Sequence, residues 1–181
     1  IKLAKSKNFK YVMLNTNGVK IANDKKFVEQ LAKLKGRFEV YLQFDGFKKE
    51  TYKKLRGADI LNVKKRAIQN LIEHKIPLTL VTTIEKGLND DELGEIINFG
   101  LESPYIRGIN FQPVAFFGRI KDTDFNDRIT LTGVINRIEK QTKGILKKSD
   151  FVPLPCHPDR IALTYMFKEN GKFVPITRKI D

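Results

Sequence analysis

The chain has 181 residues, of which 41% are hydrophobic, and it carries a formal net charge of +13. This length is enough for one domain with a substantial core, and the hydrophobic fraction excludes wholesale disorder. The single cysteine excludes an internal disulfide framework and any metal or iron–sulfur site made only of cysteines of this chain. The positive charge favours anionic partners such as nucleotides, nucleic acid or phosphorylated metabolites, without choosing among them.

No stretch of the sequence approaches the ~20 consecutive apolar residues that a membrane span needs. The first residues also lack the apolar centre of a signal peptide. We therefore expect a cytoplasmic protein. The sequence begins at Ile1 and its first methionine is Met13, so we also expect it to be a fragment of a longer protein.

The first half of the sequence alternates between strand and helix patterns. A β-prone run at residues 11–14 leads into a turn sequence, and residues 24–35 carry apolar side chains at helical spacing. Phe38–Gln43 is strand-like, and a second helix is predicted after Asp59. The lysines of these helices, Lys64 among them, are expected on polar, solvated faces.

The same alternation continues through the middle of the sequence. Residues 78–83 predict a β-branched strand and residues 90–100 a helix, followed by a strand at 108–111 and a helix at 131–140. Four βα units in succession predict an α/β fold with a mostly parallel sheet and right-handed crossovers.

The last part of the sequence departs from this rhythm. Residues 151–158 are too rich in proline for a helix or a central strand, so we expect an extended loop. Residues 162–167 and 172–176 flank Asn170 and Gly171, a strong signal for a β-hairpin. We therefore expect two parts, a βα region at 1–148 and a C-terminal extension at 149–181.

Polar residues follow each predicted strand, where parallel α/β proteins bind their ligands. They offer amides, hydroxyls, one carboxylate and flexible glycines, a set suited to gripping a small polar ligand. The candidate binding residues are Thr16, Asn17, Gly18, Gln43, Asp45, Thr82, Thr83, Gln112 and Pro113. Simple turn chemistry explains the first three equally well, and the two threonines are also ordinary strand residues. Gln43 favours a functional role, because a buried amide at the end of a strand needs partners. Gln112 slightly favours one, because a neutral amide at a strand end can read the edge of a base.

Phosphate-loop, dinucleotide-binding and nucleophile-elbow motifs are absent from the sequence. Cys156 and His157 are neighbours that could ligate a metal, although a Cys-His pair in a proline-rich loop is more often structural. The densest basic cluster is expected in the loop after the second strand, at residues 48–56. If nucleic acid binds anywhere, this cluster is where we expect it.

The motifs at the strand ends resemble, in order and spacing, strands three to six of the partial (βα)6 barrel of radical S-adenosylmethionine (SAM) enzymes. The resemblance covers residues 11–165 and is strongest to the branch similar to molybdenum cofactor biosynthesis protein A, which includes pterin methyltransferase-like and tetraether lipid synthase-like proteins. The matching segments are Asn-Thr-Asn-Gly at 15–18, Tyr-Leu-Gln-Phe-Asp-Gly-Phe at 41–47, Leu-Val-Thr-Thr at 80–83, Gly-Leu-Asn-Asp-Asp-Glu-Leu at 87–93, Asn-Phe-Gln-Pro at 110–113, Gly-Arg at 118–119 and Pro-Leu-Pro-Cys-His-Pro-Asp at 153–159.

The resemblance implies a [4Fe-4S] cluster on a three-cysteine loop, where SAM is cleaved to a 5′-deoxyadenosyl radical that abstracts a substrate hydrogen. It also implies a small-molecule substrate and a flavodoxin-like or ferredoxin-like electron donor. The sequence lacks the three-cysteine loop, so truncation is the simplest interpretation, and the fragment alone is expected to be inactive. The alternative interpretation is a basic α/β module that binds a nucleotide or RNA without catalysis.

Carried over to this sequence, the resemblance places the residues after the first strand near the cofactor. It places Gln43 and Asp45 at the ribose or methionine end, and Gln112 and Pro113 on the adenine side. Thr82 and Thr83 match the end of the next strand. Cys156 matches a cysteine of the branch that often has a second nearby.

Overall fold

The structure is a computed structural model that describes residues 1–7, 9–34, 36–116 and 124–179. The chain forms two compact units. Unit 1 comprises Ile1–Thr83 and Glu102–Gln112, and unit 2 comprises Ile84–Leu101 and Pro113–Asp181.

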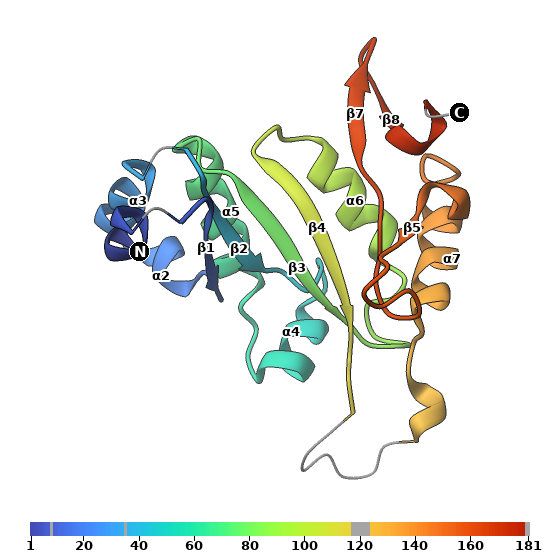
Figure 1. The fold of residues 1–181 in the computed structure, drawn as a ribbon. Helices are drawn as coiled ribbons and strands as arrows, with labels where there is room; N and C mark the ends of the chain where they lie inside the picture. The colour runs from blue at the N-terminus through green and yellow to red at the C-terminus, as the bar shows by residue number, and fades with distance from the viewer. Residues whose placement is uncertain (8, 35, 117–123, 180–181) are drawn as a thin grey trace. The chain divides into compact units, whose positions relative to one another are not determined.

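A four-stranded parallel sheet is the main element of unit 1 (Figure 1). Its strands, in spatial order, are β1 (Val12–Thr16), β2 (Phe38–Gln43), β3 (Leu78–Ile84) and β4 (Ile106–Pro113). β2 pairs in parallel with both β1 and β3. β3 and β4 run the same way, because the Leu78 N–H donates to the Tyr105 carbonyl where both strands begin and the Val114 N–H donates to the Ile84 carbonyl where both end. The predicted parallel α/β sheet is confirmed.

Helices alternate with the strands of unit 1 and contribute to its core. They are α1 (Lys2–Ser6), α2 (Val19–Asn23), α3 (Lys25–Ala32), α4 (Lys49–Arg56) and α5 (Leu61–Glu73). The side chain of Asp24 caps α3 by accepting a hydrogen bond from the Phe27 N–H. Fully buried side chains from the helices and strands form the core, including Ile21, Val28, Val40, Leu42, Ala67, Leu71, Leu78 and Leu80. Burial of each large aliphatic side chain contributes roughly 1.5–3 kcal/mol.

Unit 2 contains two packed helices and two small antiparallel sheets. The helices are α6 (Leu93–Leu101) and α7 (Leu131–Gln141), and the strand pairs are β5 (Val152–Pro153) with β6 (Ala162–Leu163) and β7 (Met166–Glu169) with β8 (Lys172–Pro175). Its described residues also include the 3-10 turns η1 (Phe125–Asp127), η2 (Lys148–Asp150) and η3 (Ile176–Arg178). α6 and α7 approach closely at Gly94, whose N–H donates to the Gln141 side chain at 2.9 Å.

The predicted hairpin in unit 2 is confirmed. Asn170 and Gly171 both have positive φ, 49° and 80°, as a two-residue hairpin turn requires. Two details were wrong. The proline-rich stretch is not entirely loop, because β5 pairs with β6, and the expected strand at residues 162–167 is divided between β6 and β7, which have different partners.

Three helical segments of unit 1 were not predicted. α1 and α2 are only five residues each, too short for a periodic signal. The basic stretch expected as a loop after β2 forms α4, which ends at Gly57 in the left-handed conformation. The expected division at residue 148 stays a prediction. Among the helices that the structure describes, none combines the length and apolar character needed to cross a bilayer.

Candidate functional site

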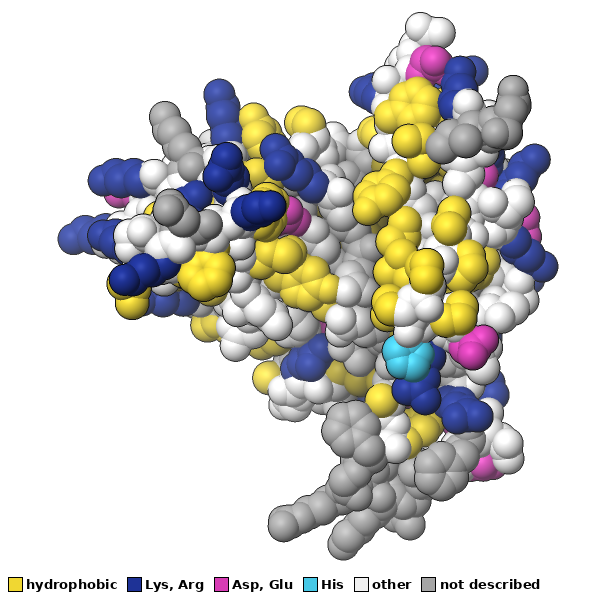
Figure 2. Space-filling model, viewed as in Figure 1, with side chains coloured by type: hydrophobic (Ala, Val, Ile, Leu, Met, Phe, Trp, Pro, Cys, Tyr) yellow, Lys and Arg dark blue, Asp and Glu magenta, His cyan; other side chains and the backbone are white. Residues whose placement is uncertain are grey.

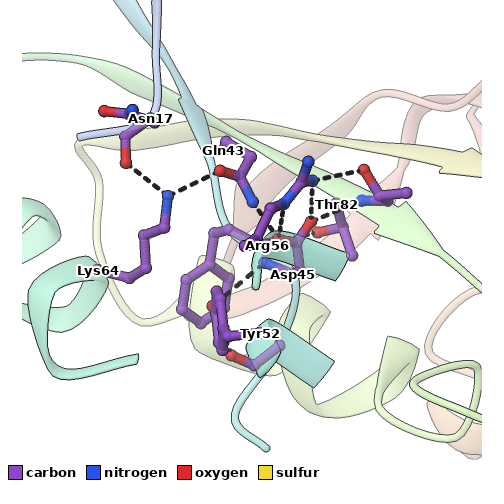
Figure 3. Close-up of polar contacts among 10 residues, drawn as sticks. Asn17, Gln43, Asp45, Tyr52, Arg56, Lys64 and Thr82 are labelled. Carbon is purple, nitrogen blue, oxygen red and sulfur yellow. Dashed lines mark hydrogen bonds and ion pairs between the residues drawn. The ribbon is translucent and has the colours of Figure 1, made fainter. Parts of the chain in front are cut away.

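A hydrogen-bonded network lies at the carboxyl ends of β1, β2 and β3, entirely within unit 1 (Figure 3). Its centre is Asp45, whose side chain is fully buried. Arg56 binds both carboxylate oxygens, with Nε and Nη2 each at 2.9 Å. The Thr83 backbone N–H donates to Oδ1 at 3.1 Å, and the Gln43 amide nitrogen donates to Oδ2. Asp45 therefore organises its neighbours and does not face solvent.

The turn after β2 and the helix α4 together produce this arrangement. Gly46 has φ of 127°, which only glycine adopts readily, so the chain turns sharply after Asp45. The Tyr52 hydroxyl, fully buried on α4, donates to the Gly46 carbonyl at 2.9 Å and accepts from the Asp45 N–H at 3.2 Å. Arg56 lies in the last turn of α4 and reaches back to the carboxylate. Its hydrogen bond with Asp45 raises the pKa of Arg56 above the ordinary value.

Lys64 is the main correction to the sequence analysis. It was expected on a solvated helix face, but its side chain is fully buried beneath the strand ends. Its ammonium donates to the Asn17 carbonyl and, at 2.8 Å, to Oε1 of Gln43. Burial lowers the pKa of Lys64 from 10.5 to about 8; the Asp45 carboxylate opposes this shift and the Arg56 guanidinium adds to it.

The turn after β1 places Thr16, Asn17 and Gly18 at the same edge of the sheet. The Thr16 hydroxyl accepts from the Gly18 N–H at 3.1 Å, and the Asn17 side-chain oxygen accepts from the Val19 N–H at 3.1 Å. Asn17 is exposed, whereas Gly18 is buried with φ of 82°. The side-chain oxygens of Thr16 and Asn17 therefore stabilise the turn by accepting hydrogen bonds from its backbone, and Asn17 remains exposed.

Thr82 and Thr83 point to opposite sides of β3. Thr82 is fully buried, and its hydroxyl donates to the Phe44 carbonyl at 2.7 Å, which ties β3 to the end of β2. The Thr83 hydroxyl accepts from Nη2 of Arg56 at 2.9 Å. Thr83 thus belongs to the Asp45 network, while a contact of Thr82 with a cofactor stays a prediction.

The remaining candidate residues belong to β4 and to unit 2. Gln112 is exposed and Pro113 half-buried, both in the last two positions of β4. The Gly118-Arg119 motif lies outside the described residues. Cys156 is exposed in unit 2, and within the described part of the chain no group of three or more His, Cys, Asp or Glu side chains could hold a metal ion. The roles assigned to Gln112, Pro113 and Cys156 stay predictions.

The donor set of the network fits a nucleoside that carries an amino acid tail. Arg56 uses Nε and Nη2 on Asp45 and Thr83, and its side chain is 30% exposed. Gln43 is half-buried and has both a donor and an acceptor for hydroxyl groups. The residues do not fit a cluster that needs three thiolates, because the chain has one cysteine.

The sequence profile of the radical SAM superfamily matches residues 1–100. The chain belongs to the radical SAM superfamily. Two curated relatives show which of its members are similar in sequence. The chain is 38% identical over 208 residues to 7,8-dihydro-6-hydroxymethylpterin dimethyltransferase of Methanocaldococcus jannaschii, covering 100% of this chain and 40% of that protein. It is 30% identical over 169 residues to GTP 3′,8-cyclase of Clostridium botulinum, covering 92% of this chain and 48% of that protein.

Solved structures show which known fold this chain shares. The structure of anSMEcpe with bound AdoMet and the Cp18Cys peptide matches with a TM-score of 0.54 at 19% identity, over 76% of this chain and 37% of that one. At this identity the likeness concerns the fold alone. The expected partial barrel of βα units is therefore confirmed, and the chain spans less than half the length of the curated relatives described above.

Sequence reasoning missed the positions of three residues in this network, Tyr52, Arg56 and Lys64. For Lys64 a signal was present, because Ala67, Ile68 and Leu71 follow it at helical spacing and all are buried. Lys64 therefore falls on the apolar face of α5. For Arg56 and Tyr52 the sequence held no comparable signal, since their roles depend on where α4 turns back toward β2.

Proposed function

We propose that the edge formed by the carboxyl ends of β1–β3 binds S-adenosylmethionine in a radical SAM enzyme of which this chain is one part. The observation that supports this most is the network in which buried Asp45 holds Arg56 and Gln43 at one strand end. Membership of the superfamily supplies the cofactor class, and the network supplies groups of the right chemistry at the edge where parallel α/β proteins bind ligands.

Each part of the network has a separate task in this proposal. Arg56, fixed by Asp45 and Thr83, binds the carboxylate of the methionine moiety through Nη1, because a guanidinium held on one side by an acid presents its other N–H groups in a defined direction. Gln43 binds the ribose hydroxyls. The Asn17 amide at the exposed end of β1 contacts the nucleoside. When bound and reductively cleaved, the cofactor supplies a 5′-deoxyadenosyl group that abstracts hydrogen from a substrate.

The cysteines for the [4Fe-4S] cluster are proposed to lie outside these 181 residues. The chain has one cysteine, and it matches 40% and 48% of the lengths of its two curated relatives. A small-molecule substrate and a flavodoxin-like or ferredoxin-like electron donor belong to the same proposal. Because both relatives are named for a pterin or a purine nucleotide, we propose a fused nitrogen heterocycle as the substrate class.

The test uses the complete protein that contains this chain, reconstituted anaerobically with iron and sulfide. We expect it to bind SAM and to release 5′-deoxyadenosine when reduced. Arg56→Met should weaken SAM binding about tenfold or more, since a charge-assisted contact contributes about 1.5–3 kcal/mol. Arg66→Met, which changes an exposed arginine on α5, is the control and should leave binding unchanged. A complete protein that neither binds SAM nor forms 5′-deoxyadenosine would refute the proposal.

A nucleic-acid-binding module is less well supported. The basic cluster at residues 48–56 forms α4, and its Arg56 is engaged by Asp45. On the face drawn in Figure 2, Lys and Arg side chains over the N-terminal helices are separated by hydrophobic and other side chains. A steep loss of RNA binding with salt, abolished by neutralising Lys53 and the neighbouring lysines of α4, would favour this module over the enzyme.

A further inference from the structure

We infer that Lys64 is a positioning residue that fixes the direction of the Gln43 amide and so sets the hydrogen-bonding pattern offered to the cofactor. The inference rests on the proposed function, because it concerns the same strand ends. Lys64 itself is fully buried. It acts through Gln43, whose amide it holds, and it also binds the backbone carbonyl of Asn17 (Figure 3).

The argument follows from the chemistry of the two groups on either side of Gln43. An ammonium is only a donor and an ionised carboxylate is only an acceptor. Gln43 lies between Lys64, which donates to Oε1, and Asp45, which accepts from Nε2. If the amide rotated by half a turn, its oxygen would face the carboxylate and its NH₂ group would face the ammonium. One orientation is therefore strongly favoured, and it leaves one N–H and one lone pair of the half-buried amide for a ligand.

The burial of Lys64 indicates that its ammonium has a task at position 64, namely to hold the Gln43 amide. A methionine of similar length would avoid the cost of burying a charge among apolar neighbours on α5 such as Ala67 and Leu71. The ammonium also joins two strand ends, because the Asn17 carbonyl follows β1 and Gln43 ends β2. The charged groups that face Lys64 are Asp45 and Arg56, and they already bind each other.

The experiment is a double-mutant cycle on SAM affinity in the complete reconstituted protein, measured by calorimetry without turnover. Lys64→Met should weaken SAM binding about fivefold to tenfold, the effect of one hydrogen bond. Gln43→Ala should weaken it by a similar factor. The double variant should bind no more weakly than Gln43→Ala alone, because Lys64 acts through that amide. Lys26→Met, an exposed lysine on α3, is the matched control and should have no effect.

A general structural role of Lys64 predicts a different result. In that case the two losses multiply in the double variant, or Lys64→Met binds SAM like the wild type, and either outcome overturns the inference. Wild-type protein that does not bind SAM refutes the proposed function instead. Thermal unfolding of each variant identifies one that fails to fold, and Lys64→Gln, which keeps a donor but removes the charge, then replaces Lys64→Met in the cycle.

Discussion

Alanine at position 18 should destabilise the junction between β1 and α2. Gly18 has φ of 82°, a conformation that costs other residues about 1–2 kcal/mol. A Cβ atom at this position would lie 2.6 Å from Cδ1 of Leu42 and 3.2 Å from Cβ of Ala67. Both neighbours are fully buried, so the core must shift at a further cost of about 1–3 kcal/mol. We expect Gly18→Ala to lower the free energy of unfolding by about 2–5 kcal/mol.

Gly57→Ala separates the two contributions. Gly57 has φ of 76°, close to that of Gly18, but a Cβ atom there would have nothing within 4 Å. Only the backbone cost applies, about 1–2 kcal/mol. Urea unfolding followed by circular dichroism measures both variants, with the slope checked for a change in the unfolded state. Equal losses for the two variants would refute the idea that close packing, and not φ alone, requires glycine at position 18.

Three further predictions concern charged groups. Asp45→Asn should lower the free energy of unfolding by about 2–4 kcal/mol in urea titrations, because it breaks the buried ion pair with Arg56. Asp59→Asn, which breaks a more exposed pair with Lys49, should change that free energy by less than about 0.5 kcal/mol. Similar losses for the two variants would contradict this prediction. The pKa of Lys64 falls from 10.5 to about 8 on folding, so the unfolded chain holds more protons than the folded chain at pH values between these two. The free energy of unfolding of the wild type relative to Lys64→Met should therefore rise with pH across that window. A difference in stability that does not change with pH would argue against this. Burial raises the pKa of Asp150, but hydrogen bonds from Arg178 and other donors outweigh this effect, so the pKa lies below its ordinary value of 3.8. The stability that the ionised Asp150 contributes is therefore lost as pH falls below about 4. Asp150→Asn should weaken this acid dependence in unfolding monitored by fluorescence of an introduced probe, and identical acid curves for the two proteins would count against it.

The error at Lys64 shows how sequence reasoning can weigh residue type above position. Lysine is rarely buried, so its type placed it in solvent. Its spacing from Ala67 and Leu71 placed it on the apolar face, and the structure follows the spacing. Lys64 can be buried because the Asn17 carbonyl and the Gln43 side-chain oxygen accept hydrogen bonds from its ammonium.

Thr82 and Thr83 illustrate a related limit. The sequence places both at the end of a strand, and alternation along the strand says only that they face opposite ways. Which of them faces Asp45 depends on how β3 is registered against β2, with Gln43 beside Val81. The register puts the Thr83 N–H on the carboxylate and sends the Thr82 hydroxyl to the Phe44 carbonyl.

Local patterns in the sequence were enough to predict the alternation of strands and helices, the parallel sheet, the hairpin at Asn170 and Gly171 and the polar character of the strand ends. These features follow from local periodicity and turn chemistry, which depend on residues close together in the chain. The folded arrangement was needed to show that Arg56 and Thr83 bind the Asp45 carboxylate and that the Lys64 ammonium donates to the side-chain oxygen of Gln43. Such contacts join residues up to 38 positions apart, and they are set by strand register and by the direction in which each helix returns to the sheet, which local patterns do not specify.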